Sequence, residues 1–149
     1  MIQRRFVRET VLQAIYAYLQ SGEPISHIMN TLLNENLKED AEALRFGERL
    51  FVLTLERKDD WDAIIKQHIK NWEISRLALI DKIILYISLS ELINFPDIPT
   101  KVTINEAIDI AKKYSTAKSG RFVNGILDAS LIQLQNEHKI SKTGRGLIG

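Results

Sequence analysis

The sequence contains no cysteine among its 149 residues. Disulfide frameworks, thiolate metal sites and cysteine nucleophiles are therefore excluded. No apolar run approaches the roughly 18 residues that a membrane span requires. The N-terminus also lacks the continuous apolar segment of a signal peptide, because arginines and an amphipathic stretch follow the first three residues directly. We therefore expect a cytoplasmic protein.

Proline and glycine are scarce, with 3 and 7 residues, and no segment alternates polar and apolar residues as a strand does. Apolar residues instead recur at spacings of three and four along nearly the whole chain. This pattern predicts an all-α, single-domain bundle of about seven helices over residues 1–138. The glycine-containing basic segment 139–149 is expected to be a disordered tail.

Local signals place the individual helices. We predict helices over Arg4–Leu19, Ile25–Leu33, Asp40–Arg57 and Ala78–Ile93, and a last helix from about Ser119. The stretch 78–93 is apolar on almost every side, which is typical of a buried central helix. A further helix carries one stripe: Trp61, Ile64, Ile65, His68, Ile69 and Trp72.

Several individual residues are also expected to have structural roles. Thr103 and Glu106 have the spacing of a capping box, which predicts a helix start at Thr103. Gly125 interrupts the last helix, where a glycine usually permits close approach of a neighbouring helix. His68 lies on an apolar stripe and is expected to be a core or boundary residue.

The net charge is only +1, but the charges are segregated. Between Glu35 and Asp62 there are nine acidic and five basic residues, whereas from Lys112 to Arg121 there are four basic residues and no acid. Segregation of this kind can create a local phosphate-binding patch on a nearly neutral protein.

The first basic cluster consists of Arg4, Arg5 and Arg8. Arginine suits phosphates and base edges, and it also stacks on unpaired bases. Cations at a helix N-terminus oppose the helix dipole, so three arginines there favour a functional role. The alternative is an ordinary solvated helix start, and the sequence alone leaves the two about equal.

The second basic cluster surrounds the start of the last helix. It contains Lys118, Ser119 and Arg121, preceded by two further lysines. A helix N-terminus offers unpaired N–H groups and a positive dipole end, which suit a phosphate. Phe122 lies beside the apolar stripe of the same helix and is placed to stack on a base. Boundary packing is the more common role of such an aromatic residue.

The sequence shows no sign of enzymatic chemistry. No spacing of histidine, aspartate and glutamate suggests a metal site, and no phosphate-binding glycine loop or nucleophile motif occurs. We therefore expect a protein that binds its partners without a cofactor and is not an enzyme.

Several blocks together resemble the NusB family of transcription antitermination factors. The resemblance covers most of the chain and rests on these blocks: Arg4-Arg5-x-x-Arg8, Gln13-Ala14-x-Tyr16, Asp81-Lys82-x-Ile84-Leu85, Glu91-Leu92, Ile98-Pro99, Val102, Ile104-Asn105-Glu106-Ala107, Ala111-Lys112 and Phe122-Val123-Asn124-Gly125-x-Leu127-Asp128.

The resemblance implies a helical bundle of two packed halves. It also implies binding of boxA-type single-stranded leader RNA, together with a small-subunit ribosomal protein that acts as NusE. The pair joins the RNA polymerase antitermination complex, chiefly on ribosomal RNA operons. The residues implied in RNA contact are Arg4, Arg5, Arg8, Lys118, Ser119, Arg121 and Phe122. The residues implied at the protein–protein face are Tyr16, Asp81 and Glu91.

Two positions depart from the family pattern. Lys118 stands where an acid is common, which adds attraction for RNA, and Tyr86 stands where an arginine is common. Some family members form homodimers, and the sequence does not decide the oligomeric state. Two alternatives stay open: a NusB-like domain of an enzyme that modifies ribosomal RNA, and a helical adaptor that binds only protein.

Overall fold

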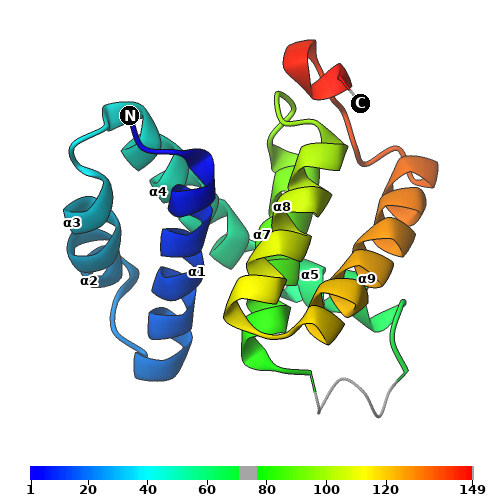
Figure 1. Cartoon of the computed structure of the whole chain (residues 1–149), viewed down its shortest axis with the longest axis horizontal. Coiled ribbons are helices and arrows are strands. Elements are labelled where there is room, and N and C mark those ends of the chain that lie inside the picture. The colour runs from blue at the N-terminus through cyan, green and yellow to red at the C-terminus, as the bar shows by residue number, and fades with distance from the viewer. Residues whose placement is uncertain (71–76, 149) are drawn as a thin grey trace. The chain divides into compact units, whose positions relative to one another are not determined.

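The computed structural model describes residues 1–70 and 77–148. Every regular element within these ranges is helical, which confirms the predicted all-α class. The chain divides into two compact units, Met1–Glu56 and Arg57–Gly149 (Figure 1). No helix in the described ranges is long and apolar enough to cross a membrane.

The first unit is built around the pairing of two long helices. Its elements are α1 (Arg4–Ser21), α2 (Ile25–Ile28), the π-helical turn η1 (Met29–Leu33), α3 (Asn34–Leu37) and α4 (Ala41–Glu56). Helix α1 packs along α4 (Figure 1). The stripe predicted on α1 lies in the core, where Val7, Val11 and Ile15 are fully buried, and α4 contributes Leu50 and Phe51.

The helical stretch that follows α1 is longer than predicted. The sequence predicts a helix that ends at Leu33, whereas the structure continues through η1 and α3 to Leu37. Ile28, Leu33 and Leu37 are all buried, although the first two are five residues apart. Residues at that spacing share a face only in a π turn, whose hydrogen bonds join residues i and i+5. The extra residue in η1 therefore keeps the apolar face turned toward the core.

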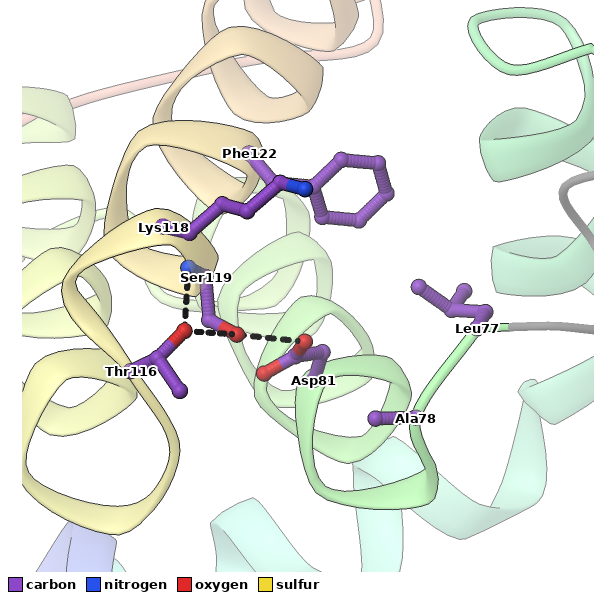
Figure 2. Close-up of a pocket in the computed structure, with 7 residues that line it drawn as sticks. All are labelled: Leu77, Ala78, Asp81, Thr116, Lys118, Ser119 and Phe122. Carbon is purple, nitrogen blue, oxygen red and sulfur yellow. Dashed lines mark hydrogen bonds between the residues drawn. The ribbon is translucent and has the colours of Figure 1, made fainter.

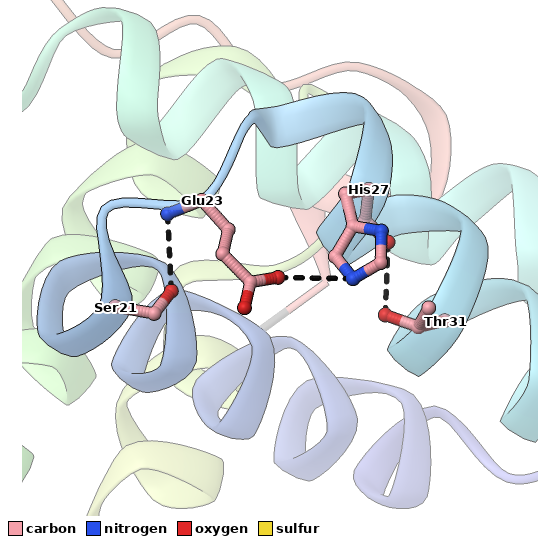
Figure 3. A network of polar contacts seen from close by, with 4 residues as sticks. All are labelled: Ser21, Glu23, His27 and Thr31. Atoms are coloured by element: carbon pink, nitrogen blue, oxygen red, sulfur yellow. Dashed lines mark hydrogen bonds and ion pairs between the residues drawn. The ribbon is translucent and has the colours of Figure 1, made fainter.

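A set of local hydrogen bonds fixes the turn between α1 and α2. Gly22 adopts φ +70° and donates its N–H to the carbonyl of Tyr18 at 3.0 Å, a helix ending that favours glycine. The Ser21 hydroxyl accepts the Glu23 N–H at 3.1 Å, and the Glu23 carboxylate lies 2.9 Å from His27 Nε2 (Figure 3). Because both side chains of this pair are about half exposed, it contributes little stability.

Asp40 marks the predicted start of a helix, and in the structure it caps α4, which begins one residue later. Its carboxylate accepts the Ala43 N–H at 3.2 Å and the Ile2 N–H at 2.9 Å. These hydrogen bonds, that of Ile2 first, lower the pKa of Asp40 below its ordinary value of 3.8.

A carboxyl group whose pKa is lowered in the folded state stabilises the fold above its unfolded pKa, and this contribution is lost as the pH falls through the folded value. We therefore expect the parent protein to lose stability below about pH 4 and the Asp40→Asn variant to lose less over the same range. Melting temperatures of both proteins between pH 2 and pH 6 test this. Parallel pH profiles would contradict it.

The second unit surrounds one buried helix. Its elements are α5 (Lys58–Lys66), α7 (Leu79–Asn94), α8 (Thr100–Tyr114), α9 (Ala117–Asn136) and the short 3₁₀ helix η2 (Gly144–Leu147). Helices α5, α8 and α9 all pack against α7 (Figure 1). Residues on every side of α7 are buried, which confirms the predicted central helix.

Helix α5 covers one side of α7 with a shorter stripe than predicted. Trp61 is fully buried, but the helix ends at Lys66, and the predicted stripe residue Trp72 lies outside the described residues. The buried Tyr86 of α7 donates its hydroxyl to the Asp62 carboxylate of α5. Burial, followed by this hydrogen bond and the negative charge of Asp62, raises the pKa of Tyr86. The tyrosine at this position therefore ties α5 to α7.

The start of α8 differs from the predicted capping box. The helix begins at Thr100 directly after Pro99, so Thr103 lies within it. The Thr103 hydroxyl instead donates to the Glu91 carboxylate of α7 at 3.0 Å. Both side chains are buried, at 2% and 1% exposure. The capping-box prediction was wrong because the threonine binds a neighbouring helix.

Gly125 also differs from its predicted role. Apart from its chain neighbours and the backbone of its own helix, a Cβ atom added there meets no described atom within 4 Å, and the glycine is exposed on α9. Because an interior helical glycine costs about 1 kcal/mol relative to alanine, we expect Gly125→Ala to raise the unfolding free energy by about that amount. Gly120→Ala is the matched control. We expect it to gain less stability, because its Cβ would lie 2.9 Å from Lys112 Cγ. Denaturant unfolding measures both variants, and a lower midpoint for Gly125→Ala would contradict the expectation.

The C-terminal segment has described structure where the sequence predicts disorder. Lys142 Nζ donates to the carbonyls of Glu91 at 3.2 Å and Phe95 at 2.8 Å, which also accept the N–H groups of Phe95 and Ile98. Thr143 N–H also donates to the Pro96 carbonyl at 3.0 Å. Loss of hydration at this place lowers the pKa of Lys142. The basic tail therefore packs against the C-terminal end of α7 through hydrogen bonds.

Candidate functional site

The first turn of α9 is held by hydroxyl groups. Thr116 caps the helix, and its Oγ1 accepts the Ser119 N–H at 3.0 Å. Ser119 Oγ lies 2.8 Å from Ser115 Oγ and 3.2 Å from Thr116 Oγ1. The sequence predicts a helix start near Ser119, and the structure places it at Ala117, two residues earlier. This arrangement fixes Ser119 at the N-terminus of α9.

A pocket of about 260 Å³ opens where the N-termini of α7 and α9 meet (Figure 2). Its lining combines one aromatic ring, two hydroxyl groups, one lysine, one carboxylate and two aliphatic side chains: Phe122, Thr116, Ser119, Lys118, Asp81, Leu77 and Ala78. Three of the predicted site residues of α9, Lys118, Ser119 and Phe122, therefore line a cavity that belongs to the second unit.

Asp81 joins the two helices at the base of this pocket. Ser119 Oγ donates to Asp81 Oδ2 at 2.9 Å, and the Asp81 side chain is 6% exposed (Figure 2). The resemblance to the NusB family implies that Asp81 lies at the protein–protein face. In the structure its carboxylate lies inside the pocket and binds Ser119.

One basic side chain, that of Lys118, lines the pocket. Lys118 and Arg121 are exposed, and Phe122 is half-buried. Lys112 of α8 comes close to α9 at Gly120, where any Cβ would touch its side chain. Positive charge, an aromatic ring and a cavity therefore lie together at one helix N-terminus, a combination suited to an anionic ligand with a flat ring.

The arginines of α1 have different environments. Arg4 is exposed, and its guanidinium lies 4.4 Å from the centre of the Phe46 ring. Arg5 is partly exposed. Arg8 is only 3% exposed and lies 5.5 Å from the same ring. Arg8 is therefore the least accessible of the three arginines, and Arg4 and Arg5 are the more accessible members of this cluster.

The residues predicted at the protein–protein face also differ from one another in how exposed their side chains are. Tyr16 of α1 is 41% exposed and is accessible to a partner. Glu91 is buried, and its side chain accepts the Thr103 hydroxyl. In this structure the buried Glu91 carboxylate therefore links α7 to α8.

A known protein family matches most of this chain. The sequence profile of the NusB family matches residues 5–131. The chain belongs to the NusB family.

Individual NusB relatives agree with this assignment. Transcription antitermination protein NusB of Salinibacter ruber is 44% identical over 149 residues, covering 100% of this chain and 93% of that protein. The protein of the same name from Chloroherpeton thalassium is 39% identical and covers 99% of this chain and 70% of its own length.

Solved NusB structures share the fold. NusB of T. maritima has a TM-score of 0.80 and 34% identity, covering 89% of this chain and 92% of that chain. A NusB chain crystallised with NusE and double-stranded RNA has a TM-score of 0.78 and 25% identity, covering 87% of this chain and 96% of that chain.

Sequence reasoning missed part of the pocket of this NusB-family chain. Leu77 and Ala78 precede α7 and carry no chemical signal, so only the fold places them beside α9. Thr116 had a usable signal, because threonine is a favoured residue immediately before a helix. Within the described ranges, no group of three or more histidine, aspartate or glutamate side chains is arranged to hold a metal ion.

Proposed function

We propose that this protein binds boxA-type single-stranded RNA as a transcription antitermination factor, together with a small-subunit ribosomal protein that acts as NusE. The observation that carries the proposal is the pocket at the start of α9, where Phe122, Lys118 and Ser119 lie together. Membership of the NusB family and the relative crystallised with NusE and RNA support it.

The proposed RNA contacts follow from exposure and chemistry. Lys118, which lines the pocket, and the exposed Arg121 attract phosphates, and Phe122 offers a ring for base stacking. Arg4 and Arg5 form a separate accessible cation cluster on the first unit. Tyr16 is the proposed contact for the ribosomal partner, since it is an exposed aromatic residue. The proposed role is binding and assembly on RNA polymerase, without a catalytic step or a cofactor.

A titration of fluorescent boxA RNA at two salt concentrations tests this function. We expect weak binding by the protein alone and tighter binding with the ribosomal partner, because two small basic patches provide few phosphate contacts. Affinity should fall as the salt concentration rises. RNA binding that does not change with salt concentration would show that the basic patches are not the RNA site. Binding of the ribosomal protein without any RNA binding would instead favour a protein-only adaptor.

A further inference from the structure

The hydroxyl groups at the start of α9 form a chain of hydrogen bonds that ends at Asp81. A serine has one hydroxyl proton, and Ser119 donates its proton to Asp81 Oδ2 at 2.9 Å. Ser119 Oγ therefore accepts the protons of Ser115 Oγ at 2.8 Å and of Thr116 Oγ1 at 3.2 Å. Figure 2 shows the part of this chain that runs from Thr116 through Ser119 to Asp81. All three hydroxyl groups are therefore oriented toward one carboxylate.

Asp81 anchors this chain of hydrogen bonds in the neighbouring helix. It lies in the first turn of α7, where the helix dipole favours a negative charge, and its side chain is only 6% exposed. A hydrogen bond to a charged group is roughly twice as strong as one between neutral groups. The carboxylate therefore ties the first turn of α9 to the first turn of α7.

The turn that Asp81 holds carries the side chains of the proposed RNA site. Lys118 directly precedes Ser119 in the sequence, and Phe122 follows Ser119 by three residues, a spacing that places both on one side of a helix. All three side chains line the pocket. A shift of the first turn of α9 would therefore move the cation and the aromatic ring together.

The Asp81 carboxylate itself is poorly placed to contact RNA. Its Oδ2 atom is occupied by Ser119, and its Oδ1 atom is buried. A carboxylate also repels the phosphate groups of RNA. Any favourable effect of Asp81 on RNA binding therefore has to pass through the Ser119 hydroxyl.

We propose that Asp81 is a positioning residue of the RNA site, because through Ser119 it holds Lys118 and Phe122 where they meet the RNA. This inference rests on the proposed RNA-binding function. It gives an acidic residue a favourable role in binding an anion, so the charge of Asp81 and its hydrogen bond have opposite effects. Loss of the charge strengthens RNA binding, whereas loss of the hydrogen bond weakens it.

Two substitutions of Asp81 separate the charge from the hydrogen bond. Asp81→Ala removes both, and we expect it to bind fluorescent boxA RNA about three- to tenfold more weakly than the parent protein, part of the loss that removal of a stacked ring would cause. Asp81→Asn is the matched variant, since its amide oxygen still accepts the Ser119 hydroxyl although the charge is gone. It should bind the RNA at least as tightly as the parent protein. Fluorescence anisotropy at one salt concentration, below the melting temperature of each variant, measures the affinities.

A double-mutant cycle tests whether the effect passes through the hydroxyl group. In the Ser119→Ala background the carboxylate has no hydroxyl group to hold, so Asp81→Ala should cause no further loss of RNA affinity. A role of Asp81 in the stability of α7 alone would produce neither this dependence on Ser119 nor the rescue by asparagine. Melting temperatures of the same proteins record the stability separately.

The outcomes separate this inference from the proposed function. Positioning by Asp81 is overturned, while RNA binding stands, if Asp81→Ala binds RNA as tightly as the parent protein or if the Ser119→Ala background retains the full loss. An Asp81→Asn variant as weak as Asp81→Ala would also overturn it. Asp81→Ser replaces Asp81→Ala if the alanine variant does not fold, because serine suits the start of a helix and is too short to keep the hydrogen bond. If the parent protein shows no salt-dependent RNA binding, the proposed function itself fails.

Discussion

The Phe122→Ala variant is expected to bind RNA about 1–3 kcal/mol more weakly than the parent protein, because it loses the ring on which a base stacks. Phe122 is half-buried and lines the pocket beside Lys118. Its removal should therefore cost less folding stability than the about 3–5 kcal/mol of a fully buried phenylalanine. RNA affinity and unfolding free energy, both measured on the same variant, give the two contributions separately.

Two further variants give this result its meaning. Phe122→Trp retains an aromatic surface and should keep most of the RNA affinity. Ile132→Ala removes another apolar side chain from α9, one that is 61% exposed and does not line the pocket, so RNA affinity should not change. A folded Phe122→Ala protein with the parent affinity would end the stacking proposal and leave the RNA site to the cations.

The Thr103→Val variant is expected to lose about 1.5–3 kcal/mol of unfolding free energy, the range for a hydrogen bond to a charged group. Valine has nearly the shape of threonine but cannot donate to Glu91, whose carboxylate is buried 3.0 Å from the Thr103 hydroxyl. Denaturant unfolding at neutral pH measures the loss.

Thr103→Ser provides the comparison, because serine retains the hydroxyl and loses only a methyl group. We expect the serine variant to be clearly more stable than the valine variant. If valine were the more stable of the two, the hydrogen bond between α8 and α7 would not contribute to the stability of the second unit.

Helix positions were largely predictable because their signals are local. The apolar character of α7 on every side identified a buried helix, and Asp40 identified the start of α4. Thr103 shows where such signals fail. Both Pro99 and the pair Thr103 and Glu106 are local start signals, and the choice between them depends on Glu91, which is 12 residues away from Thr103 in the sequence.

The candidate site was predictable only in part, because some of its contacts join residues that are distant in the sequence. Lys118 and Phe122 could be selected from the start of one helix. The contact between Asp81 and Ser119 joins residues that are 38 positions apart, so it requires knowledge of which helices pack together. The order of the tail depends on Lys142 reaching Phe95, which lies 47 residues earlier.

The π turn between Ile28 and Leu33 has a consequence for how this chain tolerates a change in length. A plain α-helix aligns residues four apart, and the π turn aligns residues five apart. Loss of one exposed residue, such as Asn30, would shorten the spacing to four and convert η1 into an ordinary α-helical turn. Ile28 and Leu33 would both remain in the core. We therefore expect this chain to tolerate the loss of a single residue at this place without a change in which side chains are buried.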